Sequence, residues 1–572
     1  MPEPSNVRSV SRIRLIFWVI VIVMGILSMQ FIRLQVLTAA APAPGSSRTV
    51  YSVERPHRGN VVDRNGNLLA TDATRYQIVA VPAVLTETMV ISVAHDLAPL
   101  VGITADELTR RMRESTTGTV VLKYYASRAT AEAVEKWQRN GLRVEYLPRR
   151  FYPEDRYGAF VVGFAQIDQK GSYGIEAKYD QFLRENGEIL PTAADGQVQP
   201  LPANFSSYVP SPVGRDLVLT IDRRIQAIAE DELRDALARY KAASGTIIVM
   251  DPKTGEILAN ASLPSFSPNT FYDTAQLPNG QDPFSDPAVA SAYEPGSVFK
   301  IVTMAAGIDS GSITPESVFE DDGVLVVGER EIRNSDRLAH GKVDIATILA
   351  KSLNIGSAQV AIKMGAPLFY NYVERFGFGN FTGIDLAGEV KGIVKKQGDT
   401  TWSQSDLATN AFGQGISVTP LQLINAVAAV ANRGAMMRPH VVKAVVANGR
   451  WYEIKPALHR TVISPAAARS LTDLLVEAAN SSIPYRAAMP GYAIAGKTGT
   501  AQIPSKEGYD ENRTIATFVG YAPAYDPAFV VLVKLDRSEV SVWATETAAP
   551  VFYRVADRLF TLLNIPPDEV RQ

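Results

Sequence analysis

The first feature of the hydrophobic pattern is an apolar run near the N-terminus. Residues 15–32 are apolar apart from a few small or polar positions, and crossing a bilayer takes about 20 such residues. Arg8, Arg12 and Arg14 precede the run, and by the positive-inside rule that end stays in the cytoplasm. We therefore expect a cytoplasmic tail at 1–14, a single transmembrane anchor at 15–34 in the cytoplasmic membrane, and the rest of the chain outside it.

A cleaved signal peptide is the alternative to this anchor. Ala39, Ala40 and Ala41 are small residues of the kind found at signal-peptide cleavage sites. The anchor is favoured because the run exceeds the roughly 7–15 residues of a signal peptide's apolar region, and because Pro42 follows the would-be cleavage point. Residues 35–47 then form a linker that ends in Ala, Pro, Gly and Ser.

Short strand-like runs and modest helices alternate over residues 48–212, without a catalytic constellation. Thr104 and Glu107 form a capping-box pattern that predicts a helix at 105–114. A second helix is predicted at 129–138. The chain becomes rich in Ser and Pro around 202–214, which indicates a domain boundary there.

The pattern over residues 213–568 predicts a second domain of mixed α/β class. The elements expected at its two ends are a strand at 215–221, a helix at 223–240, a hairpin at 245–261, a strand at 529–535 and a helix at 550–563. The middle, 297–440, is richer in helix signals. We expect helices around a sheet built from both ends of the domain, with an inserted helical subdomain.

Composition then excludes several kinds of site. The chain has 572 residues, enough for two or three domains, and no cysteine, so disulfides and cysteine nucleophiles are excluded. Its five histidines are scattered without ligand spacing, so we expect no metal and no Ser-His-Asp triad. The net charge is -2 with basic residues spread along the chain, so nucleic acid is not an expected partner. No cofactor is expected.

The first chemical motif is Ser297-Val-Phe-Lys300, which follows a Pro-Gly turn. If Ser297 opens the helix predicted there, Lys300 lies one turn further on, over the same face. A serine hydroxyl needs a base to become a nucleophile, and a lysine with a depressed pKa can serve as that base. A lone Ser-x-x-Lys occurs often by chance, as a capped helix with a solvated lysine.

Two further motifs follow in order and make the pattern more specific. Ser352-Leu-Asn354 comes after a predicted helix at 343–351, and Lys497-Thr498-Gly499-Thr500 comes near the C-terminus. In this order the three motifs are the signature of penicillin-binding proteins and serine β-lactamases. Two coincidental matches, Lys253-Thr-Gly255 and Ser267-Pro-Asn269, precede Ser297, and the first is the turn of the predicted hairpin.

A nucleotide-binding loop is a rival interpretation of the last motif. Residues 491–498 match the P-loop pattern Gly-x-x-x-x-Gly-Lys-Thr. A P-loop must open a helix, whereas Thr498 is followed by Gly499, Thr500 and then Pro504. The expected location outside the membrane also offers no ATP, so we reject a P-loop NTPase.

With these motifs, nearly everything after the anchor resembles the class B penicillin-binding proteins. The first domain adds three stretches similar to the family's pedestal motifs, which are structural: residues 58–70, 150–153 and 171–176. The pedestal's usual histidine is missing, and Phe160 stands in that vicinity. The resemblance implies a monofunctional enzyme, with a transpeptidase domain at 213–568 on an elongated α+β pedestal, of the dimerisation type, at 48–212.

The subclass follows from two stretches. Residues 293–297, Tyr-Glu-Pro-Gly-Ser, and residues 412–422 resemble the division and spore-cortex branch, whereas the elongation branch usually has Pro where Glu294 stands. This implies septal cell-wall synthesis. By resemblance the partners are peptidoglycan stem peptides, as D-Ala-D-Ala donor and amine acceptor, β-lactams, a SEDS-family glycosyltransferase and other divisome membrane proteins.

The resemblance also implies roles for the motif residues. Ser297 attacks the carbonyl between the two terminal D-alanines, Lys300 is the candidate base, and Ser352 relays a proton to the leaving amine. Asn354 is expected to donate hydrogen bonds to the substrate amide and to Lys300. Lys497 binds the substrate carboxylate with Thr498 and Thr500, beside Gly499, and the backbone amides of Ser297 and Thr500 form the oxyanion hole.

Two alternatives remain open at this point. A β-lactamase shares all three motifs and passes the acyl group rapidly to water, but the Glu-x-x-Leu-Asn string of class A enzymes is absent. The other alternative is a β-lactam sensor or scaffold without turnover. The intact motif residues argue against a catalytically silent scaffold, and a sensor would need a signalling region, for which a tail of 14 residues is too short.

Overall fold

The computed structural model describes residues 58–115, 118–184, 205, 215–274, 280–482, 489–505 and 508–570, and Trp18, Ile22, Met24 and Gly25 of the expected anchor. The chain divides into a first unit, Met1–Arg55, and a second, Pro56–Gln572. The expected tail, linker and nearly all of the anchor lie outside the described residues, as does the boundary at 212. None of the helices in the described part is long and apolar enough to cross a membrane.

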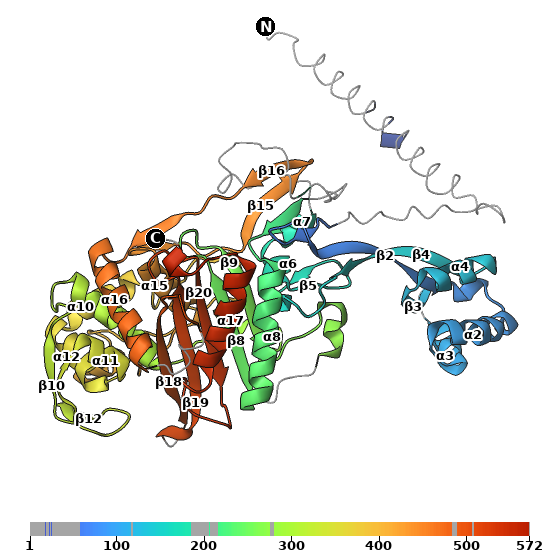
Figure 1. The fold of residues 1–572 in the computed structure, drawn as a ribbon. Helices are drawn as coiled ribbons and strands as arrows, with labels where there is room; N and C mark the ends of the chain where they lie inside the picture. Colours follow the sequence, from blue (N-terminus) through green and yellow to red (C-terminus); the bar gives the residue numbers. More distant parts are fainter. Residues whose placement is uncertain are drawn as a thin grey trace, which may run out of the picture. The chain divides into compact units, whose positions relative to one another are not determined.

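The pedestal is built on two long antiparallel strands. Strands β2 (Leu68–Ala80) and β4 (Leu142–Phe151) pair from Thr71 opposite Phe151 to Ala80 opposite Leu142. They lead to a head in which helices pack over β2 and β3 around a separate apolar core (Figure 1). The head contains α2 (Glu87–Val101), α3 (Ala105–Glu114), β3 (Val120–Ala126) and α4 (Arg128–Lys136).

The predicted helix at 105–114 is confirmed as α3, and the Thr104 side chain accepts from the backbone N–H of Glu107 at 3.3 Å. The helix predicted at 129–138 ends two residues early, at Lys136. Helix α2 was not predicted, although the Thr86 side chain caps it in the same way. The base of the pedestal holds α5 (Ala159–Val162), β5 (Phe164–Ala165), β6 (Gly171–Ser172), α6 (Gly174–Lys178) and α7 (Asp180–Arg184).

One sheet spans the two sequence halves. Strand β1 (Val61–Val62) pairs antiparallel with β2 and parallel with β7 (Asp216–Leu219), and β7 pairs with β15 (Val442–Ala447). The strand order is β16-β15-β7-β1-β2-β3, with β4 on β2 and β16 at Arg450–Glu453. The pedestal is therefore joined to the second domain through backbone hydrogen bonds as well as through side chains.

A five-stranded antiparallel sheet forms the centre of the second domain, in the order β18-β19-β20-β8-β9. Its strands are β8 (Ser244–Met250), β9 (Ile257–Leu263), β18 (Ala495–Ser505), β19 (Gly508–Ala522) and β20 (Phe529–Asp536). Side chains alternate across a strand, so Val531 and Val533 of β20 pack with α8 (Arg223–Tyr240) and α17 (Ala548–Leu562). Val530 and Leu532 face the other core.

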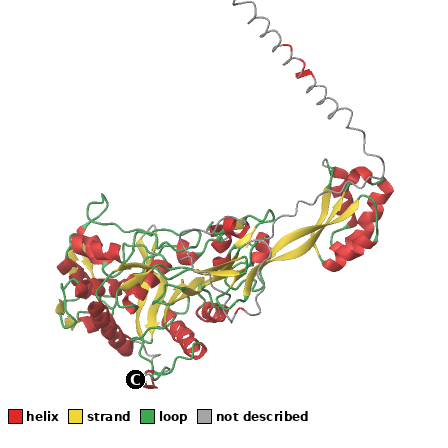
Figure 2. Cartoon of the chain, turned by 90° about the horizontal axis from the view of Figure 1, so that it is seen from above, coloured by secondary structure: helices red, strands yellow, loops and turns green. Residues whose placement is uncertain are grey.

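Helices cover both faces of this sheet, and strands and helices are layered as the mixed α/β prediction requires (Figure 2). The helical subdomain lies on the face opposite α8 and α17. Its helices are α10 (Lys300–Asp309), α11 (Ile345–Ala350), α12 (Asn354–Met364), α13 (Ala366–Arg375), α14 (Gln404–Asn410), α15 (Pro420–Ala431) and α16 (Pro465–Ser482).

Small two-stranded sheets border the helices. They pair β10 (Val318–Asp321) with β13 (Gly341–Asp344), β11 (Leu325–Val327) with β12 (Arg330–Ile332), and β14 (Ala435–Met437) with β17 (Leu458–Thr461). The predicted hairpin at 245–261 is confirmed as β8 and β9. The helix predicted at 343–351 is partly wrong, because its first residues belong to β13 and α11 begins only at Ile345, capped by Asp344.

Candidate active site

The three sequence motifs come from three separate elements. Ser297 lies in the short 3-10 helix η5 (Gly296–Phe299), which runs directly into α10 at Lys300. Ser352 and Asn354 lie where α11 gives way to α12. Lys497 to Thr500 lie on β18, the edge strand of the five-stranded sheet. The prediction that Ser297 opens a helix is confirmed, with a 3-10 rather than an α-helical first turn.

Glycines allow η5 to pack directly on β18. A Cβ on Gly499 would lie 2.8 Å from the Pro295 carbonyl oxygen and 2.7 Å from the Val298 side chain. Gly296 has a φ of +57°, which favours glycine, and a Cβ there would lie 3.1 Å from the Thr500 carbonyl oxygen. The turn that carries Ser297 and the edge strand are therefore in backbone contact, and Ser297 itself is only half-buried.

Lys300 is fully buried at the first turn of α10. Its Nζ donates to Ser352 Oγ at 3.2 Å, to Asn354 Oδ1 at 2.9 Å and to the Ser352 carbonyl oxygen at 2.5 Å. Burial, together with repulsion from Lys497, holds the pKa of Lys300 well below its usual value. The lysine thus reaches the neutral, basic form more readily than a solvated one does.

Lys497 approaches the same serine from the other side. Its Nζ donates to Ser352 Oγ at 3.1 Å and to the Thr498 carbonyl oxygen at 3.1 Å. Burial lowers the pKa of Lys497 to about 7. Because both lysines point their donors at Ser352 Oγ, that oxygen accepts from each of them, and its own proton is left for another acceptor.

The turn that carries Ser352 and Asn354 is strained. Ser352 has a φ of +59°, a left-handed conformation that non-glycine residues adopt rarely and at a cost of about 1–3 kcal/mol. Asn354 begins α12, and its Oδ1 accepts from Lys300. The expectation that Asn354 donates to Lys300 is wrong, because Asn354 Nδ2 instead donates to the Arg333 carbonyl oxygen at 3.0 Å.

Three contacts at the site were not predicted from the sequence. The backbone N–H groups of Asn354 and Ile355 both donate to Asn334 Oδ1, and the backbone N–H of Ala544 donates to Thr500 Oγ1 at 3.2 Å. Asn334 lies 20 positions before Asn354 and Ala544 lies 44 after Thr500. The sequence around these residues carries no pattern that would predict either contact, because the partners come together only in the folded chain.

The coincidental motifs take structural positions. Residues 496–500 continue as strand β18 instead of opening a helix, which contradicts a P-loop. Lys253-Thr-Gly255 is the hairpin turn, with a φ of +81° at Gly255. Asn269 supports the pedestal, where its Oδ1 accepts from the backbone N–H of Tyr152 at 3.1 Å.

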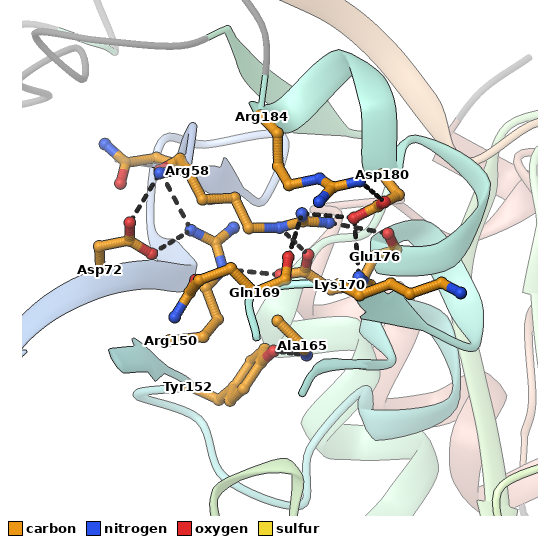
Figure 3. A network of polar contacts seen from close by, with 12 residues as sticks. Arg58, Asp72, Arg150, Tyr152, Ala165, Gln169, Lys170, Glu176, Asp180 and Arg184 are labelled. Atoms are coloured by element: carbon orange, nitrogen blue, oxygen red, sulfur yellow. Dashed lines mark hydrogen bonds and ion pairs between the residues drawn. The ribbon is translucent and has the colours of Figure 1, made fainter. Parts of the chain in front are cut away.

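The pedestal motifs meet in a buried ion-pair network (Figure 3). Glu176 accepts from Arg58 Nε at 2.5 Å and from Arg150 Nε at 2.7 Å. Arg58 also reaches Asp180, and Arg150 reaches Asp72. Phe160, in the vicinity of the missing histidine, is buried with its ring edge-on to Phe266 at 5.3 Å between centroids. These residues hold the start of β2 against the base of the pedestal.

Two family models match the chain. The penicillin-binding protein transpeptidase domain matches residues 245–557, and the penicillin-binding protein dimerisation domain matches residues 53–218. Both parts of the chain therefore match domains of penicillin-binding proteins.

Individual relatives belong to the same class of protein as the two family models. The chain is 30% identical to stage V sporulation protein D of Bacillus subtilis over 94% of its own length and 83% of the relative. It is 29% identical to the peptidoglycan D,D-transpeptidase FtsI of Escherichia coli over 89% of the chain and 84% of the relative. A crystal structure of penicillin-binding protein 3 from Mycobacterium tuberculosis in complex with aztreonam is 27% identical, with a TM-score of 0.67 over 90% of this chain and 98% of that one. Motifs, fold and relatives agree, and the chain belongs to the class B penicillin-binding proteins.

Proposed function

We propose that the chain is a peptidoglycan D,D-transpeptidase that works through an acyl-enzyme on Ser297. The observation that carries the proposal is the lysine pair around Ser352: Lys300 Nζ and Lys497 Nζ lie 3.2 and 3.1 Å from Ser352 Oγ. Burial depresses the pKa of each lysine. Lys300 follows Ser297 by three positions, where η5 runs into α10, and a neutral lysine at this spacing supplies the base that a serine nucleophile needs.

The reaction follows from these positions. Lys300 takes the proton of Ser297 while Oγ attacks the carbonyl between the two terminal D-alanines. The Oγ–C bond forms and the C–N bond breaks. Ser352 passes its proton to the amine of the departing D-Ala and is reprotonated by Lys300, which lies 3.2 Å away. An amine from a neighbouring strand then attacks the acyl-enzyme; the new C–N bond forms the cross-link, the Oγ–C bond breaks, and a proton from the attacking amine returns to Ser297 Oγ.

Strand β18 is the proposed substrate platform. Lys497, with Thr498 and Thr500, binds the stem-peptide carboxylate, and the backbone amides of Ser297 and Thr500 stabilise the oxyanion. Gly499 supports this role because its missing side chain lets η5 approach the strand. The edge position of β18 also leaves it open to an extended peptide. Asn354, in this proposal, donates to the substrate amide.

The setting of the enzyme is also a proposal. A transmembrane helix at 15–34 anchors it, the pedestal at 48–212 carries the transpeptidase domain at 213–568, and both lie outside the cytoplasmic membrane. Septal synthesis with a SEDS-family glycosyltransferase and divisome proteins fits the Glu294 motif. In support, Glu294 Oε1 accepts from the backbone N–H of Gly415 at 3.0 Å, so that the two subclass stretches contact each other.

Acylation by a penicillin tests the chemistry. We expect intact-mass spectrometry of the full chain in detergent to show one benzylpenicillin adduct that lasts for minutes or longer, and Ser297→Ala to show none. An adduct lost within seconds identifies a β-lactamase instead. No adduct on folded wild-type protein contradicts the serine mechanism and favours a scaffold.

Alkaline carbonate extraction of cell membranes tests the anchor. We expect the full chain to remain in the membrane pellet, because about 20 apolar residues embed a helix firmly. A variant with Val21→Arg and Val23→Asp should be released, since charges at the centre of a membrane helix are costly. Release of the wild-type chain contradicts the anchor.

A further inference from the structure

A buried asparagine outside the three motifs holds the start of α12. Asn334 is 3% exposed, and its Oδ1 accepts from the backbone N–H of Asn354 at 2.9 Å and of Ile355 at 3.2 Å. The first N–H groups of a helix have no carbonyl partner within it. Leu353, at the N-cap position of α12, makes no side-chain capping bond. Asn334 therefore supplies the cap from a distant segment.

The orientation of Asn334 is set by a buried aspartate. Asn334 Nδ2 donates to Asp321 Oδ2 at 2.7 Å, and Asp321 Oδ1 accepts from the backbone N–H of Gly323 at 3.0 Å. Asp321 is fully buried at the end of β10. Both oxygens of Asp321 accept hydrogen bonds, so the donor Nδ2 of Asn334 faces Asp321 and its acceptor Oδ1 faces α12.

The neighbouring peptide orients the Asn354 side chain in the same way. Because Asn354 Nδ2 donates to the Arg333 carbonyl oxygen, Asn354 Oδ1 faces Lys300 Nζ. Ser352, two positions earlier, keeps its left-handed φ of +59° only while the residues around it are held. The turn at 333–334 thus fixes the backbone and the side chain of Asn354 together.

We infer that Asn334, oriented by Asp321, is a positioning residue for the acylation step. It touches none of the reacting groups; it holds the start of α12 so that Ser352 and Asn354 meet Lys300 in the reactive arrangement. The inference rests on the proposed function, since it concerns the acylation of Ser297. It adds to the site a two-residue support that no motif in the sequence contains.

Exchange of the two side chains tests this support. In Asp321→Asn alone, two side-chain amides meet between backbone N–H groups on either side. Whichever way the two amides turn, an N–H group of one of them faces another N–H group, either of the other amide or of the backbone. In Asn334→Asp alone, two carboxylates meet across 2.7 Å. The double variant restores one donor and one acceptor between the two side chains and still presents an oxygen to α12; it loses only the longer bond from Asn334 Nδ2 to the Leu338 carbonyl oxygen, at 3.3 Å. We expect each single variant to lower the first-order acylation constant for benzylpenicillin about tenfold or more, and the double variant to recover most of it, since members of one hydrogen-bond network couple strongly.

The readouts separate positioning from general stability. In stopped-flow acylation of the full chain, the dissociation constant for benzylpenicillin should stay within about threefold of the wild type while the first-order constant falls, because a misplaced catalytic group slows the chemical step. Ser403→Ala, which removes the hydrogen bond from Ser403 Oγ to Asp406 Oδ2 at the start of α14 in the same subdomain, should leave both constants unchanged.

The outcomes decide between the claims. Any of three results would overturn the positioning role. The single variants could acylate at the wild-type rate, the double variant could acylate no faster than the slower single variant, or Ser403→Ala could lose as much of the first-order acylation constant as the single variants do. If the wild type itself is not acylated, the proposed function fails instead. Should Asn334→Asp not fold, Asp321→Asn and the double variant still make the comparison.

Discussion

At the scale of single residues, the candidate site contains two buried lysines whose pKa values lie below the usual range. Lys300 and Lys497 are both buried and share Ser352 Oγ. Burial is the main reason that the pKa of Lys300 is low, and the charge of Lys497 adds to it. In water both side chains would be ammonium ions at neutral pH. The surrounding structure therefore gives the lysine of an ordinary Ser-x-x-Lys sequence a pKa well below that of a solvated lysine, as the proposed mechanism requires.

Lys497→Ala tests this coupling through the pH dependence of acylation. Removal of the second positive charge makes the ammonium form of Lys300 less unfavourable, so the pKa of Lys300 rises. We expect the rising limb of the plot of acylation rate against pH to move to higher pH. Weaker carboxylate binding lowers the rate at every pH and does not move this limb. Lys351→Ala, an exposed lysine near the site, should not move it. An unmoved limb in Lys497→Ala contradicts the coupling.

At the scale of elements, helix α8 meets the pedestal through a buried glutamate. Glu230 Oε1 accepts from the backbone N–H of Gly158 at 2.7 Å and from Gln226 Nε2 at 2.9 Å. Burial raises the pKa of Glu230 to about 7 from an ordinary 4.5. Between these two values the folded chain holds a proton that the unfolded chain has lost. The free energy of unfolding from this group therefore falls as pH rises from about 4.5 to 7.

Glu230→Gln should remove this pH dependence, because Gln keeps the accepting oxygen without the charge. We expect the variant to be more stable than the wild type at pH 8, by about 1–3 kcal/mol, and nearly equal to it at pH 5. Thermal unfolding of the full chain at both pH values measures the difference. Asp235→Asn, on the exposed side of α8, should change neither. Equal melting temperatures for Glu230→Gln and wild type at pH 8 contradict a buried, destabilised carboxylate.

At the scale of the whole chain, the pedestal network joins segments more than 100 residues apart. Arg58 pairs with Glu176 at a separation of 118 residues, and both side chains are fully buried. Burial alone raises the pKa of Glu176, but Arg150 and Arg58 outweigh it and the pKa lies below its usual value. A carboxylate held between two arginines leaves an uncompensated buried charge when it is lost.

Glu176→Gln should therefore lower the free energy of unfolding by about 3–5 kcal/mol. The matched control is Glu132→Gln, which breaks the exposed pair with Arg128 and should cost less than about 1 kcal/mol. Chemical unfolding of the full chain, followed by tryptophan fluorescence, gives both values. Similar losses of unfolding free energy in the two variants would show that burial of the network adds nothing to stability.

Several features of the molecule were accessible from the sequence because their causes are local. A few adjacent residues predict the hairpin with its Asp-Pro-Lys-Thr-Gly turn, and another short run predicts the apolar strand β20. The motif residues could be named because the chemistry needs a serine, a lysine and an asparagine, whatever surrounds them. Their order along the chain separated them from the coincidental matches.

Tertiary structure alone decided what these residues do to one another. The depressed pKa of Lys300, the left-handed Ser352 and the acceptor role of Asn354 arise from packing between segments that lie about 50 to 200 positions apart in sequence. The Asp321 and Asn334 support and the sheet shared by β1 and β7 have the same origin. Burial and through-space contact have no local sequence signature, so they became visible only in the folded chain.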